Sequence, residues 1–321
     1  MWFKNIIAYR FTKPFTLSED ALEQKLEESP FTPCAPTEVN RQGWVSPLGR
    51  HGQQLVHVTN GHWMICLKRE DRLVPSTVVK EAVAEKVAEI EETQMRKVTK
   101  KEKDELKEQI THELLPRAFT RSKHTYAYLS PKDGFLIVNA SSAKAADDIT
   151  SFLRKTIGSL PIRIPTVNQA PAAVMTSWLT KDALMPTGFE AEAECELRDP
   201  GEEGGVVRCK GVELDGEEIS THLDAGKQAV KLALTWEDNI AFVMNEDLSS
   251  KRLKFGDVIQ EQLDDSGADD AASKFDASFA IMSMEFAKLL PAILDFNEPK
   301  TAVIVAGVIK SAPITHLLSS L

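Results

Sequence analysis

The 321-residue sequence lacks the short motifs that mark most nucleotide-driven and hydrolytic enzymes. It contains no GxxxxGK(S/T) phosphate loop, no GxGxxG fingerprint, no HExxH zinc motif and no GxSxG nucleophile elbow. The pair Gly226-Lys227 comes nearest to a phosphate loop, but the glycine-rich turn that should precede it is missing. These absences argue against an ATP-driven motor.

Cysteine is scarce. The sequence has four, Cys34, Cys66, Cys195 and Cys209, and no two of them form a CxxC pair. This spacing argues against a zinc ribbon and against a framework of disulfides. We therefore expect free thiols in a reducing cytoplasm.

Long apolar runs are also missing. Residues 1–10 are apolar but are interrupted by Lys4 and Arg10, which predicts an opening β-strand rather than a signal peptide. Residues 301–309 form an apolar tail that falls far short of the about 20 residues that a spanning helix needs. The sequence predicts no membrane role.

Candidate metal and cofactor sites are weak. The predicted strand 206–210 carries Arg208 and Lys210 with no carboxylate between them, unlike the acid-x-lysine strand of metal-dependent nucleases. His57 and His62 lie in a predicted hairpin, where histidines are more often structural than metal ligands. The acidic segment 261–270 does not match the calcium-loop spacing and is typical of a flexible linker. We expect no cofactor.

What the sequence does contain is a basic segment in an acidic chain. The formal net charge is −10, yet residues 96–103 hold five cations and one carboxylate. Basic charge that is concentrated against the overall balance often marks contact with a polyanion. The alternative is an ordinary solvated helix whose cations are neutralised by Glu102, Asp104, Glu105 and Glu108.

The periodicity predicts that this basic segment lies in a helical arm. Apolar residues recur at helical spacing after a Ser76 cap and again from Leu106 to Leu114. The sequence Thr99-Lys100-Lys101-Glu102 fits a capping box, which favours two helices that meet near Val98. If the arm were one continuous helix, Arg96, Lys100, Lys103 and Lys107 would form a single cationic stripe.

The remaining pattern predicts an α+β protein with antiparallel sheets and packed helices. Strands are expected over residues 2–11, 55–58 and 63–67, with a turn at Asn60-Gly61, and helices over 18–28, 142–156 and 275–296. The alternating acids of residues 190–194 predict an edge strand. The predicted organisation is an N-terminal α+β domain (1–75 and 120–165), an inserted arm (76–119), a C-terminal α+β domain (166–298) and a tail (299–321).

Several segments resemble the RdgC family of bacterial recombination-associated proteins. They follow the family order over residues 1 to about 296, whereas the tail from Pro299 does not match. The matching segments are residues 1–5, 31–34, 94–104, 114–119, 140–144, 158–161, 204–210, 225–227 and 251–255. The family often has lysine-glutamine or arginine-glutamine after the position of Lys210, where this chain has Gly211-Val212.

The resemblance implies a non-catalytic DNA-binding protein found in the cytoplasm and at the nucleoid. It implies a ring-shaped homodimer that encircles duplex DNA with little sequence preference, with single-stranded DNA as a further ligand. It also implies restraint of RecA-type recombinases in recombination and fork repair. Within the family pattern, Phe119 is the candidate for the dimer interface. The candidates for phosphate contacts are Arg96, Lys97, Lys100, Lys101, Arg117, Arg208, Lys210, Lys227 and Lys231.

Two other classes of function stay open. A metal-dependent nuclease could assemble its site from distant carboxylates, and magnesium-dependent cleavage of a plasmid would reveal it. A protein–protein inhibitor could hold the recombinase directly, and a pull-down without DNA would recover that pair.

Overall fold

The computed structural model describes residues 1–201, 204–295, 302–305 and 308–311. The strands of its main sheet are β1 (Asn5–Phe11), β2 (Asn40–Val45), β3 (Val56–Thr59), β4 (His62–Leu73), β5 (Phe119–Ser130), β6 (Phe135–Asn139), β7 (Ile162–Arg163), β8 (Phe189–Arg198), β9 (Val206–Lys210), β10 (Gln228–Trp236), β11 (Ile240–Asn245) and β12 (Ser250–Phe255). The helices are α1 (Glu19–Glu27), α2 (Ser76–Gln94), α3 (Lys100–Leu114), α4 (Ala143–Ile157), α5 (Pro171–Leu179), α6 (Glu217–Asp224), α7 (Asp257–Asp264) and α8 (Ala271–Asp295). Short 3-10 turns lie at η1 (Gly49–His51) and η2 (Leu115–Arg117), and β13 (Ala302–Val305) pairs with β14 (Val308–Ser311).

In the described part of the chain, one 12-stranded antiparallel sheet runs through the protein in the order β2-β4-β5-β6-β1-β12-β11-β10-β8-β9. β3 and β7 pair beside this path, with β4 and β1. The N-terminal strand joins the two halves, because Asn5 and Ile6 of β1 pair with Lys251 and Ser250 of β12. The α+β class with an antiparallel sheet is confirmed.

Helices cover the two halves of the sheet on opposite faces. In the N-terminal half, α1 and α4 pack on one face through Leu22 and Ile149, against Ile65 of β4. In the C-terminal half, α5 to α8 pack on the other face, where Leu232 and Leu234 lie against them. Because side chains alternate along a strand, the neighbouring residues of β8 to β12 point to the side that these helices leave open.

The same core crosses the predicted boundary at residue 165. Phe3, Met64 and Tyr128 from the N-terminal half share one buried cluster with Phe279 and Met282 of α8. Of the described helices, α8 has the length and composition of a membrane span, but half of that apolar window is buried in the protein. Its burial is typical of a core helix. The division into two α+β domains stays a prediction.

The arm consists of two helices, as the capping-box prediction required. Thr99 accepts a hydrogen bond from the Glu102 N–H, while the Glu102 carboxylate accepts one from the Thr99 N–H. This capping box starts α3 as a separate helix. α2 ends at Gln94, and its C-cap residue Met95 has a left-handed φ of 52°. The alternative of one continuous cationic stripe is therefore wrong. Pro116 lies in η2, just beyond α3.

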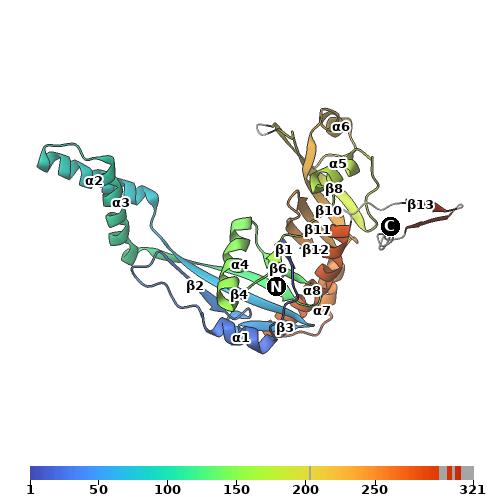
Figure 1. Ribbon diagram of the computed structural model, residues 1–321, viewed down its shortest axis with the longest axis horizontal. Helices are drawn as coiled ribbons and strands as arrows, with labels where there is room; N and C mark the ends of the chain where they lie inside the picture. Colours follow the sequence, from blue (N-terminus) through green and yellow to red (C-terminus); the bar gives the residue numbers. More distant parts are fainter. Residues whose placement is uncertain (202–203, 296–301, 306–307, 312–321) are drawn as a thin grey trace, which may run out of the picture.

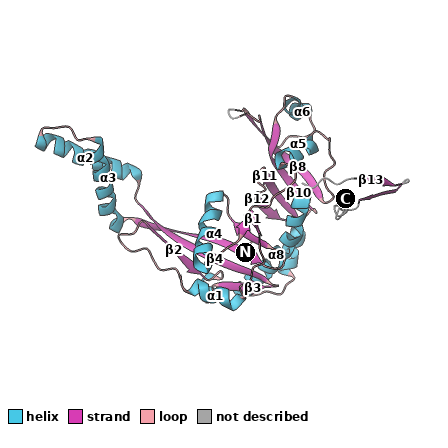
Figure 2. Cartoon of the chain, viewed as in Figure 1, coloured by secondary structure: helices cyan, strands magenta, loops and turns pink. Residues whose placement is uncertain are grey.

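The molecule has the shape of an open arc (Figure 1). The arm of α2 and α3 projects from one end, and β8, α5 and α6 form the other end, with the sheet between them. Figure 2 shows that the long strand β4 reaches from the body of the sheet to the base of the arm, and β5 pairs with it from Leu129 to Phe119. The arc places the two predicted groups of cations far apart.

Most predicted elements are confirmed within a few residues, and several details need correction. Ser18 caps α1 as expected, and Asn60 and Gly61 form the hairpin turn with φ values of 53° and 78°. Ser76 is not a cap, because Pro75 occupies the N-cap and Ser76 is already helical. The acidic segment is not all linker, since α7 continues to Asp264. β8 is an edge strand only before Glu194, because β9 pairs with Glu194–Arg198.

Candidate nucleic-acid interface

The open face of the C-terminal half of the sheet carries a basic groove. We use this name for the surface formed by Arg208, Lys210, Lys231, Lys251, Arg252 and Lys254. A cavity of about 360 Å³ lies between β8, β9, β10 and β12 and is lined by five of these six residues. A second hollow of about 350 Å³ is lined by Lys210, Arg252 and Lys254, so the two share Lys210 and Arg252.

Sheet alternation explains why Arg208, Lys210 and Lys231 share one face. Leu197 and Leu232 point into the core, so Glu196 and Lys231 beside them point outward. On β9, Cys209 packs towards the core between Arg208 and Lys210. The pairing of Glu194 with Lys210 and of Glu196 with Arg208 alternates acids and bases across the two strands.

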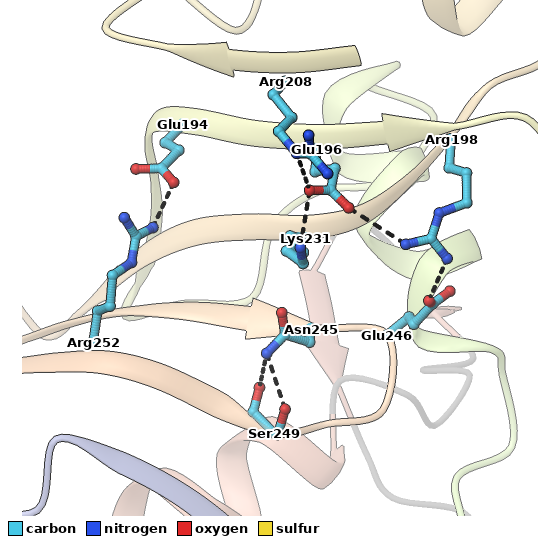
Figure 3. Close-up of polar contacts among 9 residues, drawn as sticks. All are labelled: Glu194, Glu196, Arg198, Arg208, Lys231, Asn245, Glu246, Ser249 and Arg252. Carbon is cyan, nitrogen blue, oxygen red and sulfur yellow. Dashed lines mark hydrogen bonds and ion pairs between the residues drawn. The ribbon is translucent and has the colours of Figure 1, made fainter. Parts of the chain in front are cut away.

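Glu196 is the centre of an ion-pair network (Figure 3). Its side chain is only 8% exposed and accepts ion pairs from Lys231 at 2.8 Å, Arg208 at 2.9 Å and Arg198 at 3.3 Å. Burial by itself would raise the pKa of Glu196. Hydrogen bonds and charges from Lys231 and Arg208 outweigh that effect and lower the pKa to about 2. Glu196 therefore stays ionised and fixes the positions of these cations.

The other cations of the basic groove divide into paired and unpaired. Arg252 forms an ion pair with Glu194, and this contact lowers the pKa of Glu194. Lys210, Lys251 and Lys254 form no ion pair with another described residue. These three ammonium groups can meet an anion without first releasing a carboxylate.

The sequence-based candidates in the C-terminal half do not all meet in the groove. Arg208, Lys210 and Lys231 line it together. Lys227 lies outside its lining, pairs with Asp199 at 2.7 Å and has a side chain only 15% exposed. It does not point freely to water, because the Asp199 carboxylate holds it beside the β8–β9 connection. Gly211 ends β9 with a φ of 71°, and its N–H donates to the Ala193 carbonyl.

The candidates in the arm form a separate group at the far end of the arc (Figure 1). Lys97, Lys100 and Lys101 are exposed, and Lys101 lies 3.8 Å from Glu105. Arg96 binds Glu102 through two contacts of 2.6 and 3.0 Å. The Arg96 bond is the largest of the effects that lower the pKa of Glu102 to about 2. Arg96 thus helps to hold the turn between α2 and α3.

Arg117 and Phe119 lie at the base of the arm. Arg117 is exposed at the end of η2. Phe119 begins β5 opposite Leu73 of β4, and its ring is 86% exposed. An aromatic ring with so much exposed surface contributes little to the core of one chain.

Sequence reasoning missed half of the basic groove. Lys251, Arg252 and Lys254 were not among the candidates, although the segment Lys251-Arg252-Leu253-Lys254 surrounds one buried leucine with three cations. That cluster of cations could have indicated a basic strand. Its position beside β9 and β10 depends on strand pairing across the sheet.

His57 and His62 form structural contacts. The Nε2 atom of His57 lies 2.9 Å from an Asp276 carboxylate oxygen and ties β3 to α8. His62 is buried, and burial lowers its pKa. Among the described residues, no group of three or more His, Cys, Asp or Glu side chains is arranged to hold a metal ion.

Fold and site together define an α+β protein with a long sheet, a projecting helical arm and a basic groove on an open sheet face. A family model described as "Putative exonuclease, RdgC" matches residues 1–297. The recombination-associated protein RdgC of Aeromonas hydrophila is 47% identical over 293 residues, which cover 91% of this chain and 96% of that protein. The recombination-associated proteins RdgC of Tolumonas auensis and Pseudomonas putida are each 46% identical, over 92% of this chain and 97% and 96% of their own lengths. The chain belongs to the RdgC family, as the resemblance predicted.

Proposed function

We propose that this protein is a non-catalytic DNA-binding protein of the cytoplasm and nucleoid that holds duplex DNA against its basic groove. The observation that carries the proposal is a set of three ammonium groups on one open sheet face, those of Lys210, Lys251 and Lys254, which form no ion pair within the described part of the chain. Phosphate contacts of this kind carry no base readout, so binding is largely independent of sequence. Single-stranded DNA offers the same phosphate chemistry.

The acidic net charge does not oppose this function. A charge of −10 describes the whole chain, whereas a phosphate responds to charges within the Debye length of about 10 Å at 0.1 M salt. Cations gathered on one face can therefore attract DNA while an acidic remainder keeps the protein soluble.

We further propose that two chains form a ring around the duplex. The open arc of one chain supports this assembly, because its two ends leave a gap that a second arc can close. The exposed Phe119 at the base of the arm supplies an apolar contact for closure. In a closed ring, Lys97, Lys100, Lys101 and Arg117 add to the phosphate contacts, and Arg96 joins them on release from Glu102.

We also propose that a ring on the duplex restrains RecA-type recombinases. The curated relatives are named recombination-associated proteins, which supports a role in recombination. A bound ring occupies the duplex that a recombinase filament must reach, so restraint needs no direct contact between the two proteins.

The experiment is a salt titration of duplex binding with two unrelated sequences. Log affinity should fall with log salt by about 0.9 for each neutralised phosphate, and equally for both sequences. The combined variant Lys210→Ala, Lys251→Ala, Lys254→Ala should lose about three contacts. Lys274→Ala is the matched control, because this exposed lysine lies on α8, which packs on the opposite face of the sheet. A flat salt response or a strong sequence preference would contradict the proposal.

Because the matching family model is described as an exonuclease, a second experiment tests for nuclease activity. Labelled linear duplex and plasmid are incubated with the protein and Mg²⁺ or Mn²⁺, and we expect no released nucleotides. A nuclease activity that shortens the duplex ends or nicks the plasmid, and that co-purifies with the full chain, would support the nuclease alternative. Recovery of the recombinase by the protein in DNA-free buffer would support a direct protein–protein inhibitor instead.

A further inference from the structure

Two of the cysteines face each other across neighbouring strands. Cys195 of β8 pairs directly with Cys209 of β9 in the antiparallel register. Both are free thiols in the structure, with Cys195 buried and Cys209 half-buried. The residues on either side of Cys209 are Arg208 and Lys210, two cations of the basic groove, and the cavity in that groove reaches both cysteines.

The ladder around them shows which kind of pair they form. The Gly211 N–H donates to the Ala193 carbonyl, and the Asp199 N–H donates to the Gly205 carbonyl. Hydrogen-bonded pairs alternate along an antiparallel ladder, so Cys195 and Cys209 occupy a hydrogen-bonded position. The Cα atoms of such a pair lie about 5.5 Å apart, within the range that a disulfide spans.

This position also makes a disulfide strained. The Cβ atoms of a hydrogen-bonded pair lie farther apart than those of its neighbours, whereas a disulfide needs about 3.8 Å. Closing the bond must therefore draw β9 towards β8. Strained disulfides have higher reduction potentials and are the labile, regulatory ones.

The thiols differ in reactivity. Burial raises the pKa of the Cys195 thiol to about 12, and a hydrogen bond with the Cys209 thiol adds to this effect. Cys209 is the more accessible group and is therefore the one that meets an oxidant first.

We propose that Cys195 and Cys209 form a reversible disulfide that couples the basic groove to the thiol redox state of its surroundings. The oxidant is a low-molecular-weight disulfide such as oxidised glutathione. The Cys209 thiolate attacks one of its sulfurs, forms a mixed disulfide and releases one thiol. Cys195 loses its proton and displaces the second thiol, which closes the Cys195–Cys209 bond. Two protein thiols are oxidised and the small disulfide is reduced to two thiols.

The consequence for DNA rests on the proposed function. Arg208 and Lys210 flank Cys209, so a movement of β9 towards β8 brings both cations closer to the acids opposite them, Glu196 and Glu194, which compete with phosphate. We expect the oxidised protein to bind duplex DNA more weakly, with a salt slope about one unit shallower.

The other two cysteines serve as internal controls. Cys66 is buried in the N-terminal half, where its thiol interacts with Tyr126. The Cys34 thiol donates to the Glu38 carbonyl. Neither has a cysteine opposite it in the ladder, so both should stay reduced.

The experiment uses the full chain in buffers with graded ratios of oxidised to reduced glutathione. Remaining thiols are alkylated, and peptides are identified by mass spectrometry with and without dithiothreitol. We expect two thiols to disappear together, a cross-link between the peptides of Cys195 and Cys209, and full reversal by dithiothreitol. Cys195→Ser should stop at a glutathione adduct on Cys209, and Cys209→Ser should yield neither product. Cys34→Ser with Cys66→Ser should behave as wild type.

Several outcomes would overturn the inference. They are a different pairing, a disulfide between two chains, or two thiols that persist in oxidised glutathione while circular dichroism shows a folded protein. A cross-link that forms without any change in duplex binding would overturn the coupling to the groove. Failure to bind DNA in both redox states would instead overturn the proposed function, and the cross-link would still establish the disulfide.

Discussion

The Glu196 carboxylate lies 2.8 Å from the Lys231 ammonium group at the centre of the open sheet face. The same carboxylate binds Arg208, whose side chain is 76% exposed, so a buried acid holds cations that themselves reach solvent. A phosphate that approaches the groove must compete with Glu196 for both cations. Glu196 therefore positions them and limits how strongly they attract DNA.

Replacing Glu196 tests this balance. Glu196→Gln keeps the shape of the side chain but removes one negative charge, so Lys231 and Arg208 become free to contact phosphate. We expect tighter duplex binding and a slope of log affinity against log salt that steepens by about 0.9. The measurement is fluorescence anisotropy with a labelled duplex. Glu246→Gln is the matched control, because Glu246 also pairs with Arg198 but is 45% exposed. Unchanged or weaker binding by a folded Glu196→Gln protein would contradict the interpretation.

The same carboxylate predicts a pH dependence of stability. The pKa of Glu196 is lowered to about 2 in the folded protein, from an ordinary value of 4.5. A group whose pKa falls on folding stabilises the protein above its unfolded pKa, and this contribution is lost as the pH falls through the folded pKa. We expect the difference in unfolding free energy between wild type and Glu196→Gln to be largest above pH 4.5 and to shrink towards pH 2. Urea denaturation across this range measures it, and a difference independent of pH would refute it.

Lys210 and Lys227 should respond differently to removal. Lys210 has no ion-pair partner among the described residues, so Lys210→Ala should reduce the salt slope by about one unit without changing the melting temperature. Lys227 is mostly buried against Asp199, so Lys227→Ala should lower the melting temperature and change the slope less. Paired melts and salt titrations separate the two effects. Equal slopes for the two variants would show that Lys227 leaves Asp199 to meet DNA.

Local signals in the sequence predicted the elements that depend on neighbouring residues. Thr99 and Glu102 defined the start of α3, and Asn60-Gly61 defined the hairpin turn. Both depend on hydrogen bonds or φ values within a few residues. α5 was missed because Thr176 and Ser177 are the only polar residues between Ala172 and Leu179, so the segment shows no clear polar face. Such a composition is typical of a helix packed into the core.

The composition of the basic groove depends on pairing between distant strands. Lys251 of β12 lines the same cavity as Lys210 of β9, although β11, β10 and β8 lie between these strands in the sheet. The junction of the two halves depends on β1, which meets β12 from the opposite end of the chain. The sequence also could not predict the ion pairs of Arg96 with Glu102 and of Lys227 with Asp199. A count of cations does not show which of them are already neutralised by a carboxylate.

Phe119 distinguishes closure of the proposed ring from folding of the single chain. Its ring is 86% exposed, so Phe119→Ala removes little buried surface from the monomer, and we expect an unchanged melting temperature at low protein concentration. If the closed dimer covers the Phe119 side chain, its truncation to alanine costs about 1.5–3 kcal/mol of apolar burial at that contact. Dimers should then dissociate at lower concentration in analytical ultracentrifugation, and circular duplex should be retained less well through a high-salt wash. Met95→Ala is the matched control, because Met95 is 90% exposed at the tip of the arm and is not assigned to closure. A steep loss of monomer stability would make Phe119 a core aromatic, whereas normal dimerisation and retention would remove it from the interface.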